Sequence, residues 1–391
     1  MDSKGRIITE ITFEDNDASA SAFGWQFQLL SAIPLILRDI KNVKHFIIEG
    51  KYQDVEIYYS DDTQSFIQAK AVQMEDSENN STKNSKFKQA IISLYKTPFV
   101  DSEKIIYCSN FKSPILDDAA LFSNKLVNYN NCPASIKNQI DSLITDAATL
   151  VENELKTKKK NAESNGKILD KKVEESMSML SERLRNDSLK TNIYFYTVYP
   201  FFGEGRLEER ASVIDDKIVS FLSDKIQLKP KSAVAISTRL LKHWAVCFLN
   251  DAGTISTSDS KKITKQELLW PIVVFNSSFD TELVKETMKG RITSSDISEA
   301  EAHLNDEVFL QLQRFQFLHK LYKDFASYLK SITSINPELD FIKEKWDSYK
   351  EEFDIYTSNS VQLEYITKCY LYRLLLDYRS SNNLNNGANV W

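Results

Sequence analysis

Residues 43–73 constrain the fold more than any other stretch, because they indicate three strands joined by short polar turns. "VKHFIIEG" (43–50) is largely apolar, "DVEIYY" (54–59) alternates apolar and polar residues, and "SFIQAKAVQ" (65–73) follows the polar turn "SDDTQ". Alternation with a period of two is typical of strands. A meander of this kind must pack against other elements to bury its apolar side chains.

The flanking segments predict how the meander is covered. Residues 18–40 have helical spacing with an expected interruption at Pro34, and residues 86–97 predict a second helix. Residues 74–86 contain one apolar side chain and predict a surface loop, whereas residues 104–110 predict a strand. The resulting α-β-β-β-α-β order implies a mixed sheet with helices against it.

The middle of the chain predicts an antiparallel helical hairpin inserted into this first domain. Two runs with apolar residues at 3–4 spacing flank the polar stretch "KTKKKNAESNG", and "NIYFYTVYP" (192–200) predicts a returning strand. We therefore expect a first α/β domain at 1–212, with its insertion at about 134–190. A second, mostly α-helical domain is expected at 213–391.

Three local expectations concern the second domain. Thr264 and Glu267 have the T-x-x-E spacing of a helix capping box. "PIVVFN" (271–276) predicts a short strand, and the polar residues 380–391 predict a frayed tail.

Composition excludes several classes of protein. The formal net charge of −6 argues against a protein that coats nucleic acid without specificity, so any DNA contact must come from a local patch or a partner. The 4 cysteines have no CxxC spacing and there are only 4 histidines, which argues against a zinc site and favours reduced thiols in the cytosol. Because no signal peptide or membrane-spanning stretch is evident, we expect a soluble intracellular protein with no membrane partner.

Three polar residues on the predicted strands allow a chemical interpretation. Asp54, Gln68 and Lys70 are placed where strand residues are most often simply solvated. However, Gln68 and Lys70 are two apart and share a face, and Asp54 on the neighbouring strand can lie across from them. Asp54, the Gln68 amide oxygen and the Ala69 carbonyl can then hold Mg²⁺, while Lys70 aligns or activates a water for cutting a phosphodiester.

The pattern D-(13 residues)-Q-x-K, preceded by Glu49 and by "FGWQFQ" in the first helix, resembles the PD-(D/E)xK restriction-endonuclease-like superfamily. Within it, the pattern is most similar to the double-stranded-DNA nuclease domain of bacterial antiphage effectors. The matching positions are Gly24 and Gln28, Glu49 and Asp54, and Gln68 and Lys70. The resemblance covers roughly residues 15–110, and the strand near 194–200 completes the domain.

The resemblance implies a restriction-endonuclease-like fold, Mg²⁺ or Mn²⁺ as cofactor, and further roles in the site. Glu49 is implied as an additional metal ligand, and Gln28 is implied to reach a metal-bound water or a phosphate. The superfamily usually has an acid where this chain has Gln68, so metal binding depends more on Glu49 or on the substrate. Glu49 facing solvent, Glu56 as a solvated strand residue and Gly24 easing helix packing stay open as simpler interpretations.

Lysines near the predicted loop supply a candidate DNA contact. No acidic residue lies among residues 79–100, so these lysines either form a phosphate-contacting edge or are a solvated helix face. The four are Lys83, Lys86, Lys88 and Lys96.

The length and the helical second half favour one class of effector. They resemble the nuclease subunit of Lamassu-type, ABC-three-component defence systems. This resemblance implies an SMC-like ATPase partner, a small accessory subunit, and a dormant bacterial cytoplasmic nuclease that is released to oligomerise and cut double-stranded DNA. Two alternatives are a nuclease gated by a cyclic oligonucleotide and a catalytically silent scaffold subunit.

Overall fold

The computed structural model describes residues 22–73, 80–97, 103–111, 123–202, 206–252, 262–277, 281–312 and 315–390. Two compact units divide the chain. The first holds the described residues up to Asp39, together with Val43–Lys217 and Ala245–Lys262. The second holds Ile40–Asn42, Ile218–Trp244 and the chain from Ile263 onward.

A mixed sheet organises the first unit, as the sequence predicted. Within this unit the strand order is β5-β6-β4-β3-β2-β1, in which β1, β2 and β3 are antiparallel neighbours and β3, β4 and β6 are parallel. The predicted meander and the returning strand are therefore confirmed. The strands of this unit are β1 (Val43–Ile48), β2 (Val55–Tyr59), β3 (Gln64–Lys70), β4 (Lys104–Ser109), β5 (Val127–Asn128) and β6 (Ile193–Thr197). The two-residue strand β7 (Ile263–Thr264) belongs to the second unit.

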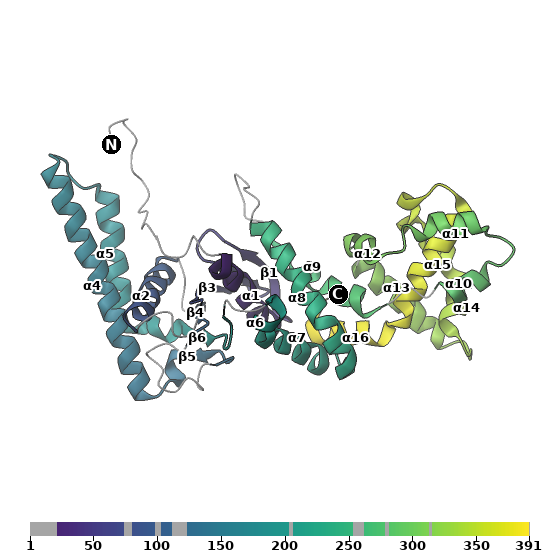
Figure 1. Ribbon diagram of the computed structural model, residues 1–391, viewed down its shortest axis with the longest axis horizontal. Helices are drawn as coiled ribbons and strands as arrows, with labels where there is room; N and C mark the ends of the chain where they lie inside the picture. The colour runs from purple at the N-terminus through teal and green to yellow at the C-terminus, as the bar shows by residue number, and fades with distance from the viewer. Residues whose placement is uncertain are drawn as a thin grey trace. The chain divides into compact units, whose positions relative to one another are not determined.

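Helices cover both faces of this sheet (Figure 1). One face carries Phe66, Tyr107 and Phe195, which pack in one hydrophobic core with α2 (Asn80–Lys96) and with the hairpin of α4 (Ala134–Ser164) and α5 (Lys171–Arg185). The predicted hairpin is therefore confirmed. Side chains alternate along a strand, so Cys108 points to the opposite face, where it meets Ser31 of α1 (Ala22–Arg38).

Two helices of the first unit differ from the sequence-based expectation. The helix α1 runs through Pro34 without a break. The helix α2 begins at Asn80, so the loop expected up to residue 86 is wrong over 80–86, and residues 74–79 lie outside the described residues. Burial of Phe87, Ala90 and Ile91 against the sheet explains why this polar segment is helical, since tertiary packing overrides weak local propensity.

The second unit is built from helices. The predicted capping box is confirmed, because Glu267 accepts the N–H of Thr264 at 2.6 Å and Thr264 accepts the N–H of Glu267 at 3.2 Å. This cap starts α9 (Lys265–Asn276), which includes residues 271–276, so the short strand expected there is wrong. The expected frayed tail is also wrong, because Leu384 and Ala388 of α16 (Tyr378–Ala388) are buried.

The remaining helices are α6 (Leu207–Arg210), α7 (Ser212–Asp224), α8 (Pro230–Ala252), α9 (Lys265–Asn276), α10 (Glu282–Thr287), α11 (Ser294–Glu301), α12 (Asp306–Leu312), α13 (Phe315–Leu329), α14 (Pro337–Lys345), α15 (Ser360–Leu376) and α16 (Tyr378–Ala388). Short 3-10 helices are η1 (Tyr129–Asn131), η2 (Asp187–Asn192), η3 (Trp346–Glu352) and η4 (Asp354–Tyr356). Among the described residues, none of the helices combines the length and apolar character needed to span a bilayer.

Buried charges in α15 are paired. Glu364 accepts Lys368 Nζ at 2.6 Å and is bound bidentately by Arg291 at 3.0 and 2.6 Å. Arg373 is fully buried and donates to Asp306 Oδ1 at 2.9 Å. Because removal of one member of a buried pair leaves an uncompensated charge, these contacts explain polar residues in an otherwise apolar helix core.

Asn110 provides a test of how the strand ends are held together. This fully buried side chain follows β4, accepts the Val72 N–H at 2.9 Å, and donates to the Val72 and Phe201 carbonyls at 2.7 and 2.6 Å. We expect Asn110→Ala to lower the free energy of unfolding by about 2–4 kcal/mol in urea denaturation, because three buried backbone groups lose their partner. Asn165→Ala, which removes one exposed bond to Asn161, should change it by less than about 0.5 kcal/mol.

Candidate active site

A polar cluster lies where β1 and β3 end and β2 begins. Asp54 directly precedes β2, whose Val55 pairs with Ile67 of β3, so Asp54 comes to lie beside Gln68. Asp54 Oδ2 accepts Gln68 Nε2 at 2.7 Å and the Ala69 N–H at 2.8 Å. The side chain of Gln28, from α1, also hydrogen-bonds to Asp54.

Lys70 completes this part of the cluster. Gln68 and Lys70 are two residues apart on β3 and therefore project from the same face. Both are nearly buried, with 6% and 7% of their surface exposed. The ammonium group of Lys70 lies near enough to Asp54 to lower the pKa of that carboxyl group, against the larger opposing effect of burial. The residues predicted to converge are therefore neighbours.

Glu49 contributes a second carboxyl group at the same place. Its backbone is left-handed, with φ of 51°, and its N–H donates to the Asp54 carbonyl at 2.7 Å. Its carboxylate accepts the indole N–H of Trp25, which follows Gly24 in α1. An aromatic residue in an apolar helix gives no signal of such a contact in the sequence. The motif "FGWQFQ" therefore supplies both Trp25 and Gln28, one to each acid.

The pKa values of both carboxyl groups are raised, so each ionises at a higher pH than usual. Desolvation raises the pKa of Asp54 to about 6, and the hydrogen bonds from Ala69 and Gln68 offset only part of this effect. Desolvation and then the charge of Asp54 raise the pKa of Glu49 to about 7. Two neighbouring carboxyl groups of this kind are stabilised in their charged forms by a cation between or beside them.

The donor set fits a hard divalent cation better than a soft one. Mg²⁺ prefers carboxylate, amide and carbonyl oxygens, which Asp54, Glu49 and Gln68 provide. In the described part of the chain, no group of three or more His, Cys, Asp or Glu side chains could hold a metal ion. A metal here therefore depends on neutral oxygens and on the substrate. The structure shows the N–H of Ala69, rather than its carbonyl, in contact with Asp54.

Glu56 is not the solvated residue that the alternation suggested. It is 1% exposed, and its Oε1 accepts the N–H groups of Tyr52 at 2.6 Å and Gln53 at 3.3 Å, while Oε2 accepts the Tyr58 hydroxyl at 2.6 Å. Gly50 packs directly on the Glu56 carboxylate, where a Cβ atom would collide. Glu56 therefore fixes the conformation of the turn between β1 and β2 by accepting two of its backbone N–H groups.

The four lysines proposed to contact DNA all lie on α2 but do not share one of its faces. At 100° per residue, the positions of Lys83 and Lys86 are adjacent, whereas Lys88 and Lys96 lie on other sides. Lys86 is buried, and Lys88 Nζ lies 3.7 Å from Asp146 of α4. The four lysines are therefore dispersed around the helix, and a single phosphate-contacting edge stays a prediction.

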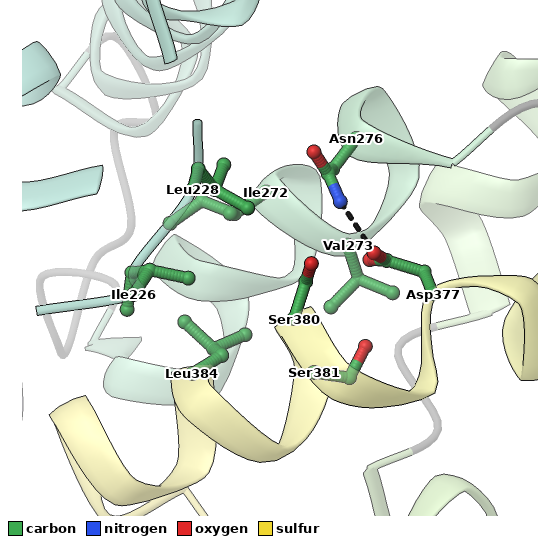
Figure 2. Close-up of a pocket in the computed structure, with 9 residues that line it drawn as sticks. All are labelled: Ile226, Leu228, Ile272, Val273, Asn276, Asp377, Ser380, Ser381 and Leu384. Carbon is green, nitrogen blue, oxygen red and sulfur yellow. Dashed lines mark hydrogen bonds between the residues drawn. The ribbon is translucent and has the colours of Figure 1, made fainter. Parts of the chain in front are cut away.

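The described residues of the second unit line a small pocket (Figure 2). Its volume is about 10 Å³, which is room for one water molecule and not for a cyclic oligonucleotide. Asn276 Nδ2 donates to Asp377 at 2.6 Å beside it, and burial raises the pKa of Asp377. The lining residues are Ile226, Leu228, Ile272, Val273, Asn276, Asp377, Ser380, Ser381 and Leu384.

Comparison of this chain with family models, with curated proteins and with solved structures gave no match. The proposed function therefore rests on the polar cluster of Glu49, Asp54, Gln68 and Lys70.

The role of Glu56 is testable by removing its charge. Glutamine at this position would direct its amide NH2 group at a hydrogen-bond donor that Glu56 now accepts. We therefore expect Glu56→Gln to lower the free energy of unfolding by about 1–3 kcal/mol in urea denaturation. The exposed Glu163→Gln should leave it unchanged within about 0.5 kcal/mol. An equal effect of both substitutions would contradict the role of Glu56.

The raised pKa of Glu49 predicts a pH dependence of stability. A folded-state pKa of about 7, above the ordinary 4.5, gives stability that is present in acid and is lost as pH rises through 7. We expect Glu49→Gln, in metal-free buffer, to reduce the loss of stability between pH 5 and pH 8 by about 1 kcal/mol. This value allows for solvent screening, because the residue keeps an exposed surface although its carboxyl group is partly desolvated. Thermal melts would show this as a smaller decrease of Tm, by about 2–4 °C.

Glu175→Gln is the matched control for this experiment, because Glu175 is exposed and its ion pair is with Lys171, one turn away on the surface of the same helix. The same reduction in both variants would show that the pH dependence does not arise at the cluster.

Proposed function

We propose that this protein is a Mg²⁺-dependent endonuclease that cuts double-stranded DNA. The observation that carries the proposal is the hydrogen-bonded convergence of Asp54 and Gln68, with Lys70 and Glu49 in their electrostatic neighbourhood. Phosphodiester hydrolysis needs oxygen ligands for a hard cation and a positive group near the attacking oxygen. The cluster has both within two adjacent strand ends.

Each side chain has a task that follows from its contacts. Asp54 and Glu49 would hold Mg²⁺, together with the Gln68 amide oxygen after rotation of the amide, and the Ala69 carbonyl is a further candidate. When bound, the cation offsets phosphate charge and makes a water a better nucleophile. Lys70 would orient that water and stabilise negative charge on the phosphate. Gln28 and the Ala69 N–H fix the orientation of Asp54.

The electrostatics support a substrate that brings a cation with it. Two carboxyl groups alone repel a phosphate, so binding of a polyanion without Mg²⁺ is disfavoured. A neutral Gln68 in place of an acid lowers the negative charge of the site. This makes the metal more dependent on substrate phosphate oxygens, and links metal binding to DNA binding. Mn²⁺, which accepts the same oxygen ligands, is the expected substitute.

The proposal extends to the biological setting through the resemblance of the sequence. In that setting the protein is the effector subunit of a bacterial antiphage or antiplasmid complex in the cytoplasm. An SMC-like ATPase and a small accessory subunit keep it inactive, and its release and oligomerisation activate cleavage. The water-sized pocket of Figure 2 is too small to hold a cyclic oligonucleotide. The complete set of Asp54, Gln68 and Lys70 favours an enzyme over a silent scaffold.

Cleavage of plasmid and linear duplex DNA by the purified protein, alone and released from partner subunits, tests the proposal. We expect cleavage with Mg²⁺ or Mn²⁺, none with EDTA, and a loss of about 10²–10⁴-fold in rate for Lys70→Ala, because a positioned proton-transfer or charge-stabilising group is removed. Asp54→Asn should cause a comparable loss.

Lys44→Ala serves as the control, because Lys44 is an exposed lysine at the other end of β1, 3.8 Å from Asp62. Cleavage that persists in Lys70→Ala and Asp54→Asn at the wild-type rate would place the activity elsewhere. Absence of cleavage under all of these conditions would remove the proposed function.

A further inference from the structure

The turn between β1 and β2 projects from the candidate active site itself. It spans residues 49–54, so the two carboxyl groups of the cluster are its first and last residues. The Glu49 N–H donates to the Asp54 carbonyl at 2.7 Å, and the Gly50 N–H donates to the Gln53 carbonyl at 3.0 Å. These bonds close the turn at its base and leave Lys51 and Tyr52 at its tip.

Buried groups hold this turn in one conformation. Glu56 accepts two of its N–H groups from below, and Gly50 is the residue that lets the chain pass over the Glu56 carboxylate. Gln53 is 5% exposed and donates to the Ser93 carbonyl at 2.8 Å and to Thr97 Oγ1 at 2.7 Å, both at the end of α2. A turn that only joins two strands needs no such support, and burying a carboxylate costs free energy unless its bonds offset the cost.

The turn presents a cation and an aromatic ring outward. Lys51 is exposed, and Tyr52 is 39% exposed. Lys51 Nζ lies 5.2 Å from the centre of the Tyr52 ring. This ring is nearly perpendicular to the ring of Phe66, and the two ring centres are 6.1 Å apart. The Tyr52 ring is therefore in contact with Phe66 on one side and exposed on another. Lysine and tyrosine side chains are common contacts to the phosphates and sugars of DNA.

We propose that Lys51 and Tyr52 hold the DNA backbone beside the bond that is cut, with Lys51 on a phosphate and Tyr52 on the adjacent sugar and phosphate. This inference rests on the proposed function and adds a substrate-holding element to it. The contact is to the backbone, so it carries no base specificity. It also supplies positive charge on the solvent side of two carboxyl groups, where a phosphate would otherwise be repelled.

Binding can be measured separately from cleavage in the Lys70→Ala protein. We would titrate it with a fluorescent 20-base-pair duplex in Ca²⁺ buffer at several salt concentrations and follow anisotropy. Adding Lys51→Ala should weaken binding about 3–10-fold and reduce the slope of log K against log salt by about 1, because one phosphate contact is lost. Adding Tyr52→Ala should weaken binding about 5-fold or more, whereas Tyr52→Phe should retain most of the affinity.

Lys44→Ala in the same background is the matched control and should leave both the affinity and the salt slope unchanged. Duplexes of unrelated sequence should respond equally to Lys51→Ala. Unchanged affinity and salt slope in both Lys51→Ala and Tyr52→Ala would overturn the inference and leave the proposed nuclease standing. Absence of duplex binding at low salt would also overturn it, while absence of cleavage by the wild-type protein would remove the nuclease itself.

Discussion

The carboxylate of Asp54 joins two strands and a helix at one point, and the arrangement around it depends on that junction. Its Oδ2 receives the Ala69 N–H and the Gln68 amide of β3, while Gln28 approaches from α1. The buried carboxylate would be unfavourable without these donors. In turn, the donors fix where β2 begins relative to the end of β3, and hence where Gln68, Lys70 and the turn of residues 49–54 are placed.

Asp54, which precedes β2, and Glu56, which lies within it, have different environments. Asp54 lies at the strand end next to Glu49, where burial opposes its negative charge and where that charge helps to raise the pKa of Glu49. Glu56 lies two residues further on, where two backbone N–H groups and a hydroxyl satisfy it. A nearby cation would therefore stabilise the charged form of Asp54, whereas Glu56 already has hydrogen-bond donors and fixes the conformation of the turn.

Much of the first unit was predictable from the sequence because its strands alternate cleanly and its hairpin has strong helical periodicity. The grouping of Asp54, Gln68 and Lys70 was also predictable, since a period of two and a short turn determine which residues face each other. The burial of Glu56 was not, because an acid in an alternating strand gives the same pattern whether water or backbone N–H groups surround it. Residues 80–86 and 271–276 were misassigned for a related reason. Their helical state comes from packing of Phe87 and from a cap at Thr264, which outweigh local composition.

The hairpin insertion has a consequence for how the protein is made. Ser109 of β4 and Thr197 of β6 are paired neighbours in a parallel ladder, yet the whole of α4 and α5 is synthesised between them. All side chains of the candidate site leave the ribosome before β6 exists, and long-range parallel pairing is slow to form. During that interval the outer edge of β4 is unpaired, and such an edge is prone to associate with other chains until the hairpin folds back and brings β6 into place.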